Sequence, residues 1–133
     1  MRVIIIGCGR VGSVLANRLD EIGNKVIVLD RNQNAFRRLS EKFSGERIVG
    51  NGLMEEFLNP ILEQEVDLLF AMTDKDNINL MIAQKVKRTS RVKRVFAIVH
   101  DSILSGLFKE LGLCTICPTD LVIKELLQMI QED

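Results

Sequence analysis

The chain has 133 residues, with 18 Lys and Arg against 18 Asp and Glu and one His. This length suits one domain with a real core, and the balanced charge leaves no basic field for a nucleic-acid backbone, so that partner is excluded. No apolar stretch reaches the roughly 18 residues of a membrane span, and the short apolar start is typical of a buried strand rather than a signal peptide. With three scattered cysteines, we expect a reducing cytoplasm.

Strand-like and helix-like patterns alternate along the whole chain. Apolar runs predict strands at Arg2–Ile6, Lys25–Leu29, Arg47–Val49, Asp67–Met72, Arg94–Val99 and Leu113–Ile116. Helical patterns follow, first with Val11, Leu15, Leu19 and Ile22 on one face, then over Asn32–Phe43, Leu53–Leu58, Asp76–Lys87, Ser102–Leu111 and Leu121–Ile130. Six buried strands joined by helices predict an α/β fold with a Rossmann-type doubly wound parallel sheet in the order 3-2-1-4-5-6. Without a linker or repeat, residues 1–133 are expected to form a single domain.

Three helices have apolar residues whose partners can be predicted. We expect two faces to point inward, namely Ala35, Phe36, Leu39 and Phe43 in one helix and Ile103, Leu104, Leu107, Phe108 and Leu111 in another. The last helix carries more than one apolar stripe, formed by Leu121, Val122, Ile123, Leu126, Leu127, Met129 and Ile130. It should either contact both its own sheet and a partner, or simply pack deeply in the domain.

The turn after the first strand has the pattern of a dinucleotide site, Gly7-Cys8-Gly9-Arg10-Val11-Gly12. Gly7 permits the tight turn, Gly9 lets a pyrophosphate approach the backbone, and Gly12 lets the helix pack closely on its strand. The phosphates would lie at the helix N-terminus, where free N–H groups and the positive end of the dipole point at them.

Asp30 ends the second strand, where the ribose of such a nucleotide should lie. Its carboxylate can accept bonds from both ribose hydroxyls and repels a 2′-phosphate, which favours NAD or NADH, or an adenine nucleotide, over NADP. Arg31 opposes this selectivity, because a guanidinium there could receive a phosphate. Alternatively, Asp30 caps a turn. Arg10 either reaches a terminal phosphate or lies in solvent.

Polar residues also follow the third and fourth strands. Gly50-Asn51-Gly52 offers an amide that could pair with an adenine edge, although these residues also favour an ordinary turn. Met72-Thr73-Asp74 should face the same crevice. Asn79, a polar residue in an apolar helix, is expected to bond the glycine turn. Asp76 and Asn77 are typical of a helix N-terminus, and solvated surface is an equal alternative for Asp74 and Asp76.

The sequence predicts neither a catalytic set nor a metal site. His100, near the end of the fifth strand, could serve as a general base, but no Tyr, Ser-His-Asp set or metal cluster accompanies it. We expect it at the ligand rim or surface. Cys114 and Cys117 form a C-x-x-C without a second pair, so structural thiols are expected. Cys8 is interpreted as a small filler, sensitive to oxidation only if exposed.

Together these motifs resemble the nucleotide-binding domain of the RCK/KTN family, which includes the TrkA N-terminal domains that regulate potassium channels and transporters. The matching pieces are Gly7-x-Gly9-Arg10-x-Gly12, Val28-Leu29-Asp30, Val49-Gly50-Asn51, Met72-Thr73-Asp74-x-Asp76-x-x-Asn79-Leu80, and Leu111-Gly112 leading to Cys117-Pro118. The segment after the fourth strand is the most specific, because generic dinucleotide folds do not need it. The chain departs from the family at Asn51, where an acid is common, and at His100, where an Asn is common.

The resemblance implies a sensor that binds NAD, NADH, ATP or ADP without turnover. Such a cytoplasmic regulatory subunit would form a homodimer or higher homo-oligomer and would reach the membrane through a potassium channel or transporter partner. The nucleotide would act by binding two assembly states differently. The sequence shows no counterpart of the C-terminal ligand domain common in the family, so we interpret it as a stand-alone subunit or an excised domain.

Two other functions stay open at this point. One is a small NAD-dependent oxidoreductase, or the cofactor-binding half of one. A missing substrate domain and a poor supply of acid–base groups oppose it. The other is a structural adaptor with a dinucleotide fold that binds no nucleotide.

Overall fold

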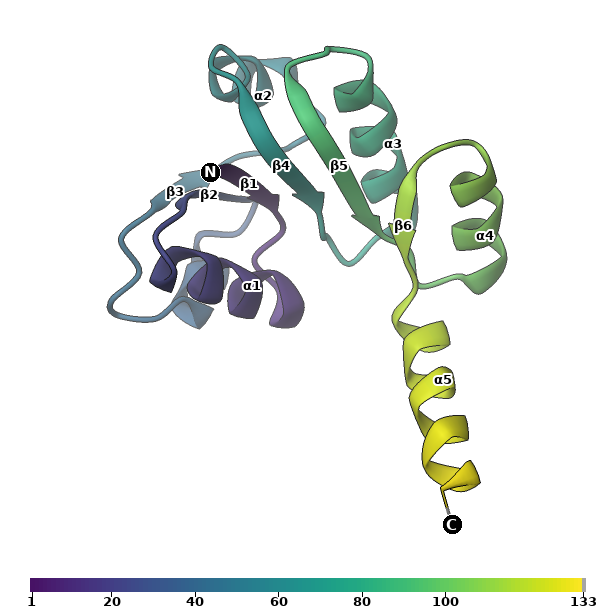
Figure 1. Cartoon of the computed structure of the whole chain (residues 1–133). Coiled ribbons are helices and arrows are strands. Elements are labelled where there is room, and N and C mark those ends of the chain that lie inside the picture. The colour runs from purple at the N-terminus through teal and green to yellow at the C-terminus, as the bar shows by residue number, and fades with distance from the viewer. Residues whose placement is uncertain (133) are drawn as a thin grey trace.

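The computed structural model describes residues 1–132, and its centre is one parallel sheet (Figure 1). The strands are β1 (Arg2–Ile6), β2 (Lys25–Asp30), β3 (Glu46–Val49), β4 (Val66–Ala71), β5 (Val92–Ile98) and β6 (Cys114–Ile116). They pair in the order β3-β2-β1-β4-β5-β6, and every neighbouring pair is parallel. The predicted Rossmann-type fold and strand order are therefore confirmed.

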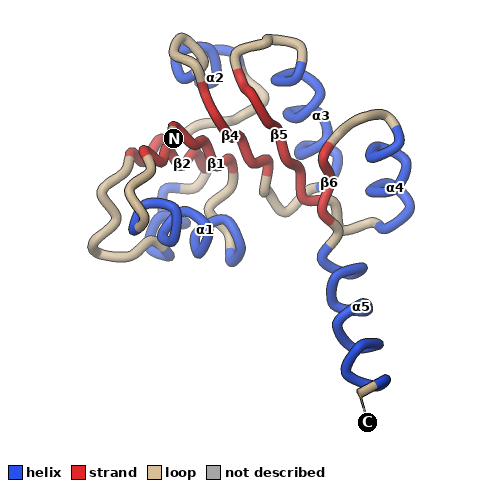
Figure 2. Tube along the Cα trace, in the orientation of Figure 1, coloured by secondary structure: helices blue, strands red, loops and turns tan. Residues whose placement is uncertain are grey.

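Helices cover both faces of the sheet (Figure 2). The covering helices are α1 (Arg10–Glu21), a 3₁₀ segment η1 (Gln33–Arg38), α2 (Glu55–Ile61), α3 (Asp76–Lys87) and α4 (Ser102–Glu110). A last helix, α5 (Pro118–Gln131), follows β6. Successive strand residues point to opposite faces, so Ile4 and Ile6 pack in the cluster with α2, α3 and α4, while Val3 and Ile5 pack with α1 and η1. This two-sided burial explains why the strands are almost continuously apolar.

The buried face of α1 agrees only in part with the predicted one. Leu15 and Leu19 pack against the core as predicted, but Val11 and Ile22 are 54% and 76% exposed. Gly12, Ser13 and Ala16 are buried instead. The reason is close approach: a Cβ on Gly12 would lie within van der Waals overlap of the Gly7 carbonyl oxygen. The helix therefore rests on the glycine turn through its small residues.

The helix predicted over Asn32–Phe43 is also wrong in type and length. Only Gln33–Arg38 is helical, and it is a 3₁₀ segment. The Ser40 N–H donates to the side chain of Asn17 on α1, and Leu39 is already extended, so the helix does not continue. Its apolar residues still face inward, with Ala35, Leu39 and Phe43 buried and Phe36 packed against them.

The short third helix begins later and ends later than predicted. It spans Glu55–Ile61 and includes Pro60, which lies beyond the predicted end at Leu58. Pro60 removes one N–H, but the N–H of Leu62 closes the last turn on Leu58 and Asn59. Leu58 and Ile61 are buried, and their packing holds this extra turn.

Helix α4 buries a narrower face than predicted. Leu104 and Phe108 pack on the core, but Ile103, Leu107 and Leu111 are 83%, 50% and 65% exposed. The helix lies against the edge strand β6, where the Ser105 hydroxyl bonds Thr115 Oγ1 at 3.0 Å. A helix over the sheet edge has room to bury only one narrow stripe.

Helix α5 projects from the domain, as Figure 1 shows. Residues 1–132 bury none of its side chains between Pro118 and Gln131. The alternative that it packs deeply in its own domain is therefore wrong, and so is the expected contact with its own sheet. The sheet face on the α1 side is only partly covered over β4, β5 and β6, where Phe70 stacks on Phe96 and both stay partly exposed. Within the described chain, no helix is both long and apolar enough to span a membrane.

Candidate functional site

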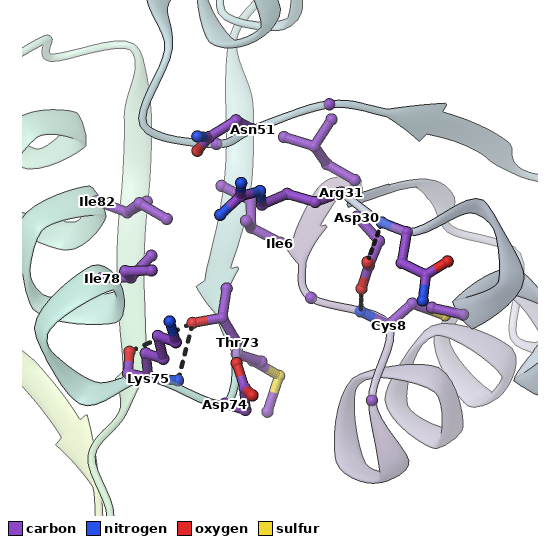
Figure 3. Close-up of a pocket in the computed structure, with 18 of the residues that line it drawn as sticks. Ile6, Cys8, Asp30, Arg31, Asn51, Thr73, Asp74, Lys75, Ile78 and Ile82 are labelled. Carbon is purple, nitrogen blue, oxygen red and sulfur yellow. Dashed lines mark hydrogen bonds between the residues drawn. The ribbon is translucent and has the colours of Figure 1, made fainter.

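A cavity of about 380 Å³ lies where β1, β2, β3 and β4 end, the edge at which doubly wound sheets bind ligands (Figure 3). It brings together most of the predicted binding residues. Those that line it are Gly7, Cys8, Gly9, Asp30, Arg31, Gly50, Asn51, Gly52, Met72, Thr73 and Asp74. Arg10, Val11, Gly12 and Asn79 lie outside the lining.

The three glycines of the turn have different roles in the fold. Gly7 has φ +108° and a Cβ there would lie 2.5 Å from the Met72 carbonyl oxygen, so the tight turn requires glycine. Gly12 is needed for the contact of α1 with Gly7. A Cβ on Gly9, by contrast, would have no atom of residues 1–132 within 4 Å beyond its immediate chain neighbours. The fold therefore leaves open space at the position where a pyrophosphate was predicted.

Helix α1 begins beside this space. Gly9 is its N-cap, and within the described chain no side chain caps it and no acid lies in its first turn. The first N–H groups of a helix have no intrahelical partner, and the dipole is positive there. Arg10 and Val11 are exposed in this first turn. The end of the cavity at α1 is therefore suited to an anion.

The Asp30 carboxylate is already fixed by two backbone groups. It accepts hydrogen bonds from Cys8 N at 2.7 Å and Asn32 N at 2.8 Å. Asp30 therefore caps a turn, which was the alternative expected from the sequence. Each carboxylate oxygen has capacity for a further bond, and Asp30 remains partly exposed in the cavity.

The loop after β3 is held close to the sheet. A Cβ on Gly50 would lie 2.4 Å from the Phe57 ring, and one on Gly52 would lie 2.8 Å from Ile6. Asn51 forms an ordinary turn, because its Oδ1 accepts from Leu53 N at 3.0 Å. This bond leaves the Asn51 side-chain N–H₂ group to donate at the cavity wall.

Asn79 organises the loop after β4. It is fully buried, and its Oδ1 accepts from Thr73 N at 2.8 Å and from the Thr73 hydroxyl at 2.6 Å. Its Nδ2 donates to the carbonyls of Thr73 and Ile98. The prediction that Asn79 bonds the glycine turn is therefore wrong. It joins the ends of β4 and β5 and positions Thr73 at the cavity.

Asp76 performs a similar task at the start of α3. It accepts bonds from His100 N, Asp101 N and the His100 ring. Burial alone would raise the pKa of Asp76, but these donors outweigh it and hold the pKa below its ordinary value. His100 therefore lies outside the glycine-turn cavity, in an adjoining open hollow that shares Asp74 and Lys75 with it.

The cysteines are free thiols in different surroundings. Cys8 is 0% exposed, and burial together with the charge of Asp30 raises the pKa of its thiol to about 11. Cys117 is buried and donates to the His100 carbonyl, while Cys114 is exposed. Cys8 therefore keeps its thiol proton at neutral pH and is a small buried side chain of the core, in line with its interpretation as a filler.

Sequence reasoning missed several residues of the cavity: Ile6, Leu29, Asn32, Ala35, Arg38, Lys75, Ile78 and Ile82. Ile78 and Ile82 lie four residues apart on α3, a spacing that places them on one face. That signal was available in the sequence. Arg38 reaches the carbonyl of Cys8 at 3.5 Å from η1, a contact that depends on the tertiary fold.

The model of the TrkA-N domain family matches residues 3–119. The chain belongs to the TrkA-N domain family. This match confirms the resemblance drawn from the motifs. The Trk system potassium uptake protein TrkA of Streptomyces coelicolor is 34% identical over 116 residues, which are 87% of this chain and 52% of that protein. The chain thus spans about half the length of this relative.

Two solved structures share the fold. The TrkA-N domain of the inner membrane protein ybaL from Escherichia coli has a TM-score of 0.78 at 18% identity, over 96% of this chain and 95% of that one. The Kef CTD of Shewanella denitrificans, in an AMP-bound form, has a TM-score of 0.77 at 21% identity, over 98% and 82%. At sequence identities this low, the two structures show a shared fold and no more.

Proposed function

We propose that this TrkA-N domain binds an adenine nucleotide at the glycine-turn cavity and senses it without consuming it. NAD or NADH is the first candidate, and ATP or ADP is the alternative. One observation carries the proposal: at Gly9 the cavity opens next to the N-terminus of α1, and residues 1–132 leave that space open. A phosphate ester fits this combination of open backbone and positive helix end.

The rest of the cavity suits the remaining parts of such a ligand. The ribose is placed at Asp30, whose carboxylate also disfavours a 2′-phosphate by like-charge repulsion. The adenine is placed near Asn51, whose amide N–H₂ group can donate to its edge. The AMP-bound form of the Kef neighbour supports an adenine nucleotide on this fold.

The relatives support a role in potassium transport. The TrkA relative is named as a potassium uptake protein, and this chain corresponds to about half of it. We therefore propose that the domain belongs to the cytoplasmic regulatory part of a potassium channel or transporter system. It would be peripheral to the membrane through that partner, and nucleotide binding would bias the geometry of the assembly.

The second candidate is an NAD-dependent oxidoreductase. His100 is its best acid–base residue, but its ring bonds Asp76 at 3.0 Å in the hollow beside the glycine-turn cavity. The thiol nearest the phosphate position, Cys8, is buried and has a raised pKa. Both observations favour binding without turnover.

A second copy of the chain is the proposed assembly partner. Helix α5 has its apolar side chains exposed, and β4–β6 leave an apolar face partly open in the same molecule. An exposed apolar helix of one copy can pack on the partly open sheet face of another copy. A homodimer or a higher homo-oligomer would bury both.

A ligand panel tests the nucleotide proposal. Thermal unfolding is measured with NAD, NADH, NADP, ATP and ADP, and a nucleotide at 100 times its Kd should stabilise the fold by about 2.7 kcal/mol. We expect shifts with NAD and NADH that exceed the shift with NADP. NADH absorbance should not fall when carbonyl substrates are added. The absence of any shift contradicts nucleotide binding. A substrate-dependent NADH loss that disappears in His100→Ala favours the oxidoreductase instead.

A further inference from the structure

Arg31 lines the cavity and has no ion-pair partner among residues 1–132. It follows Asp30 at the end of β2, yet the two side chains diverge (Figure 3). Asp30 turns back to the backbone of Cys8, whereas Arg31 extends toward the wall that α3 contributes. Among residues 1–132, none of the ion pairs involves Arg31. Its guanidinium is therefore directed away from the ribose position and retains all its donors for a ligand.

The part of the cavity wall toward which Arg31 extends is apolar. It includes Ile6, Ile78 and Ile82, and Ile78 is the side chain that a ligand can contact, because Ile6 and Ile82 are only 3% and 0% exposed as residues whereas Ile78 is partly exposed. The loop after β3 rests on the same side chains, since a Cβ on Gly52 would lie 3.2 Å from Ile82. A flat body with apolar faces fits between this wall and a guanidinium plane. A polar edge of that body would meet the donating amide of Asn51.

We propose that Arg31 holds the base of the bound nucleotide by stacking its guanidinium over the adenine ring, with the partly exposed Ile78 on the other face. This inference rests on the proposed function and identifies its base-binding residue. Arginine is suited to the task because its planar group stacks on aromatic rings and carries a charge that the ring face attracts. The same side chain is then unavailable to a 2′-phosphate, so Asp30 alone sets that selectivity.

The test compares three ligands on four proteins. Adenosine, NAD and NADP are titrated into the wild-type chain and into Arg31→Ala, Arg31→Lys and Arg37→Ala. Calorimetry gives the dissociation constants of NAD and NADP, and ligand-observed NMR gives that of adenosine. Arg37→Ala is the matched control. Arg37 lies on η1 and is exposed like Arg31, but it is outside the cavity lining. Far-UV circular dichroism verifies that each variant is folded.

We expect Arg31→Ala to weaken adenosine, NAD and NADP by a similar factor of about five or more. Arg31→Lys should restore little of the affinity, because an ammonium keeps the charge but loses the plane. Arg37→Ala should bind like the wild type. Equal losses for adenosine and NAD are the decisive result, since adenosine has no phosphate to be attracted.

Other results overturn the inference in distinct ways. A loss confined to NADP that Arg31→Lys restores makes Arg31 a phosphate receiver. A loss for NAD without one for adenosine indicates long-range attraction of the diphosphate. Unchanged affinities leave Arg31 in solvent. In all three cases the wild type still binds, so the proposed function stands. A wild type that binds none of the three ligands, and that NADH, ATP and ADP also fail to stabilise in the thermal unfolding panel, overturns both proposals.

Discussion

Gly7 and Gly12 serve the fold, whereas Gly9 serves only the cavity. A side chain on Gly7 or Gly12 would collide with backbone carbonyl oxygens, and Gly7 also has a positive φ. Gly9 has φ −86° and ψ −159°, an extended conformation that other residues adopt. Substitution at Gly9 therefore separates the requirements of a ligand from those of folding.

Gly9→Val should keep the fold and lose the nucleotide. The free protein has room for the new side chain, so the thermal midpoint without ligand should stay close to that of the wild type. A branched side chain at the pyrophosphate position should raise the Kd for NAD at least tenfold, about 1.4 kcal/mol. Calorimetry measures the affinity. A folded variant that binds as tightly as the wild type would place the phosphates elsewhere. Gly7→Val is the contrasting variant, expected to unfold.

The candidate site was predictable where it depends on local motifs and not where it depends on distant contacts. The glycine turn, Asp30 and the loops after β3 and β4 were recognised in sequence because each follows a strand, and parallel strands end at one edge. The partners of Asn79 could not be predicted, because Ile98 meets it only once β5 lies beside α3. Arg38 joins the cavity for the same reason.

At the scale of single elements, α3 is the structural link of the site. Its predicted bounds Asp76–Lys87 are confirmed, because charged ends and an apolar repeat point to the same helix. Asn79 ties it to the loop after β4, and Asp76 ties it to the loop after β5. The segment with η1 shows the opposite case. The apolar residues of this segment have helical spacing, but the Ser40 N–H donates a hydrogen bond to the Asn17 side chain of α1 instead of continuing the helix. Tertiary contacts thus override a local pattern.

The bond network of Asp76 predicts a pH-dependent stability. Its lowered pKa means that the folded state favours the carboxylate, so this stabilisation is complete above the ordinary pKa of 3.8 and is lost as the pH falls through the lowered value. Asp76→Ala should therefore reduce the free energy of unfolding at pH 7 by about 1.5–3 kcal/mol, the range for hydrogen bonds to a charged group.

The difference between the two proteins should shrink below about pH 4, where unfolded Asp is protonated. Urea unfolding of the ligand-free proteins at pH 7, 5 and 3 gives both free energies. Asp74→Ala is the control, because Asp74 is exposed two residues earlier on the same loop. A gap between Asp76→Ala and the wild type that is the same at pH 7 and pH 3 would contradict the assigned role of the carboxylate.

At the scale of the whole molecule, the sheet was predictable and the place of α5 was not. Strand order follows from handedness and the position of the glycine turn, which the sequence contains. The burial of a terminal helix depends on what it contacts, and an apolar pattern is the same whether that partner is its own sheet or another copy. Helix α5 has Leu126 and Met129 at 48% and 56% exposure in one chain. The exposed apolar side chains of α5 and the partly open face of β4–β6 lie in the same chain.

The final prediction is a homodimer that depends on α5. Burial of one leucine is worth about 1.5–3 kcal/mol, so two or three side chains of α5 matter to an association. Leu126→Glu combined with Met129→Glu should dissociate the dimer and leave the domain folded, since residues 1–132 bury neither side chain. Sedimentation gives the mass and circular dichroism gives the fold. Ile103→Glu with Leu107→Glu is the matched variant on α4, also exposed, and should leave the dimer intact. A wild type that sediments as a monomer at micromolar concentrations, with and without nucleotide, refutes the dimer. A dimer that survives the α5 changes but not the α4 changes moves the interface to α4.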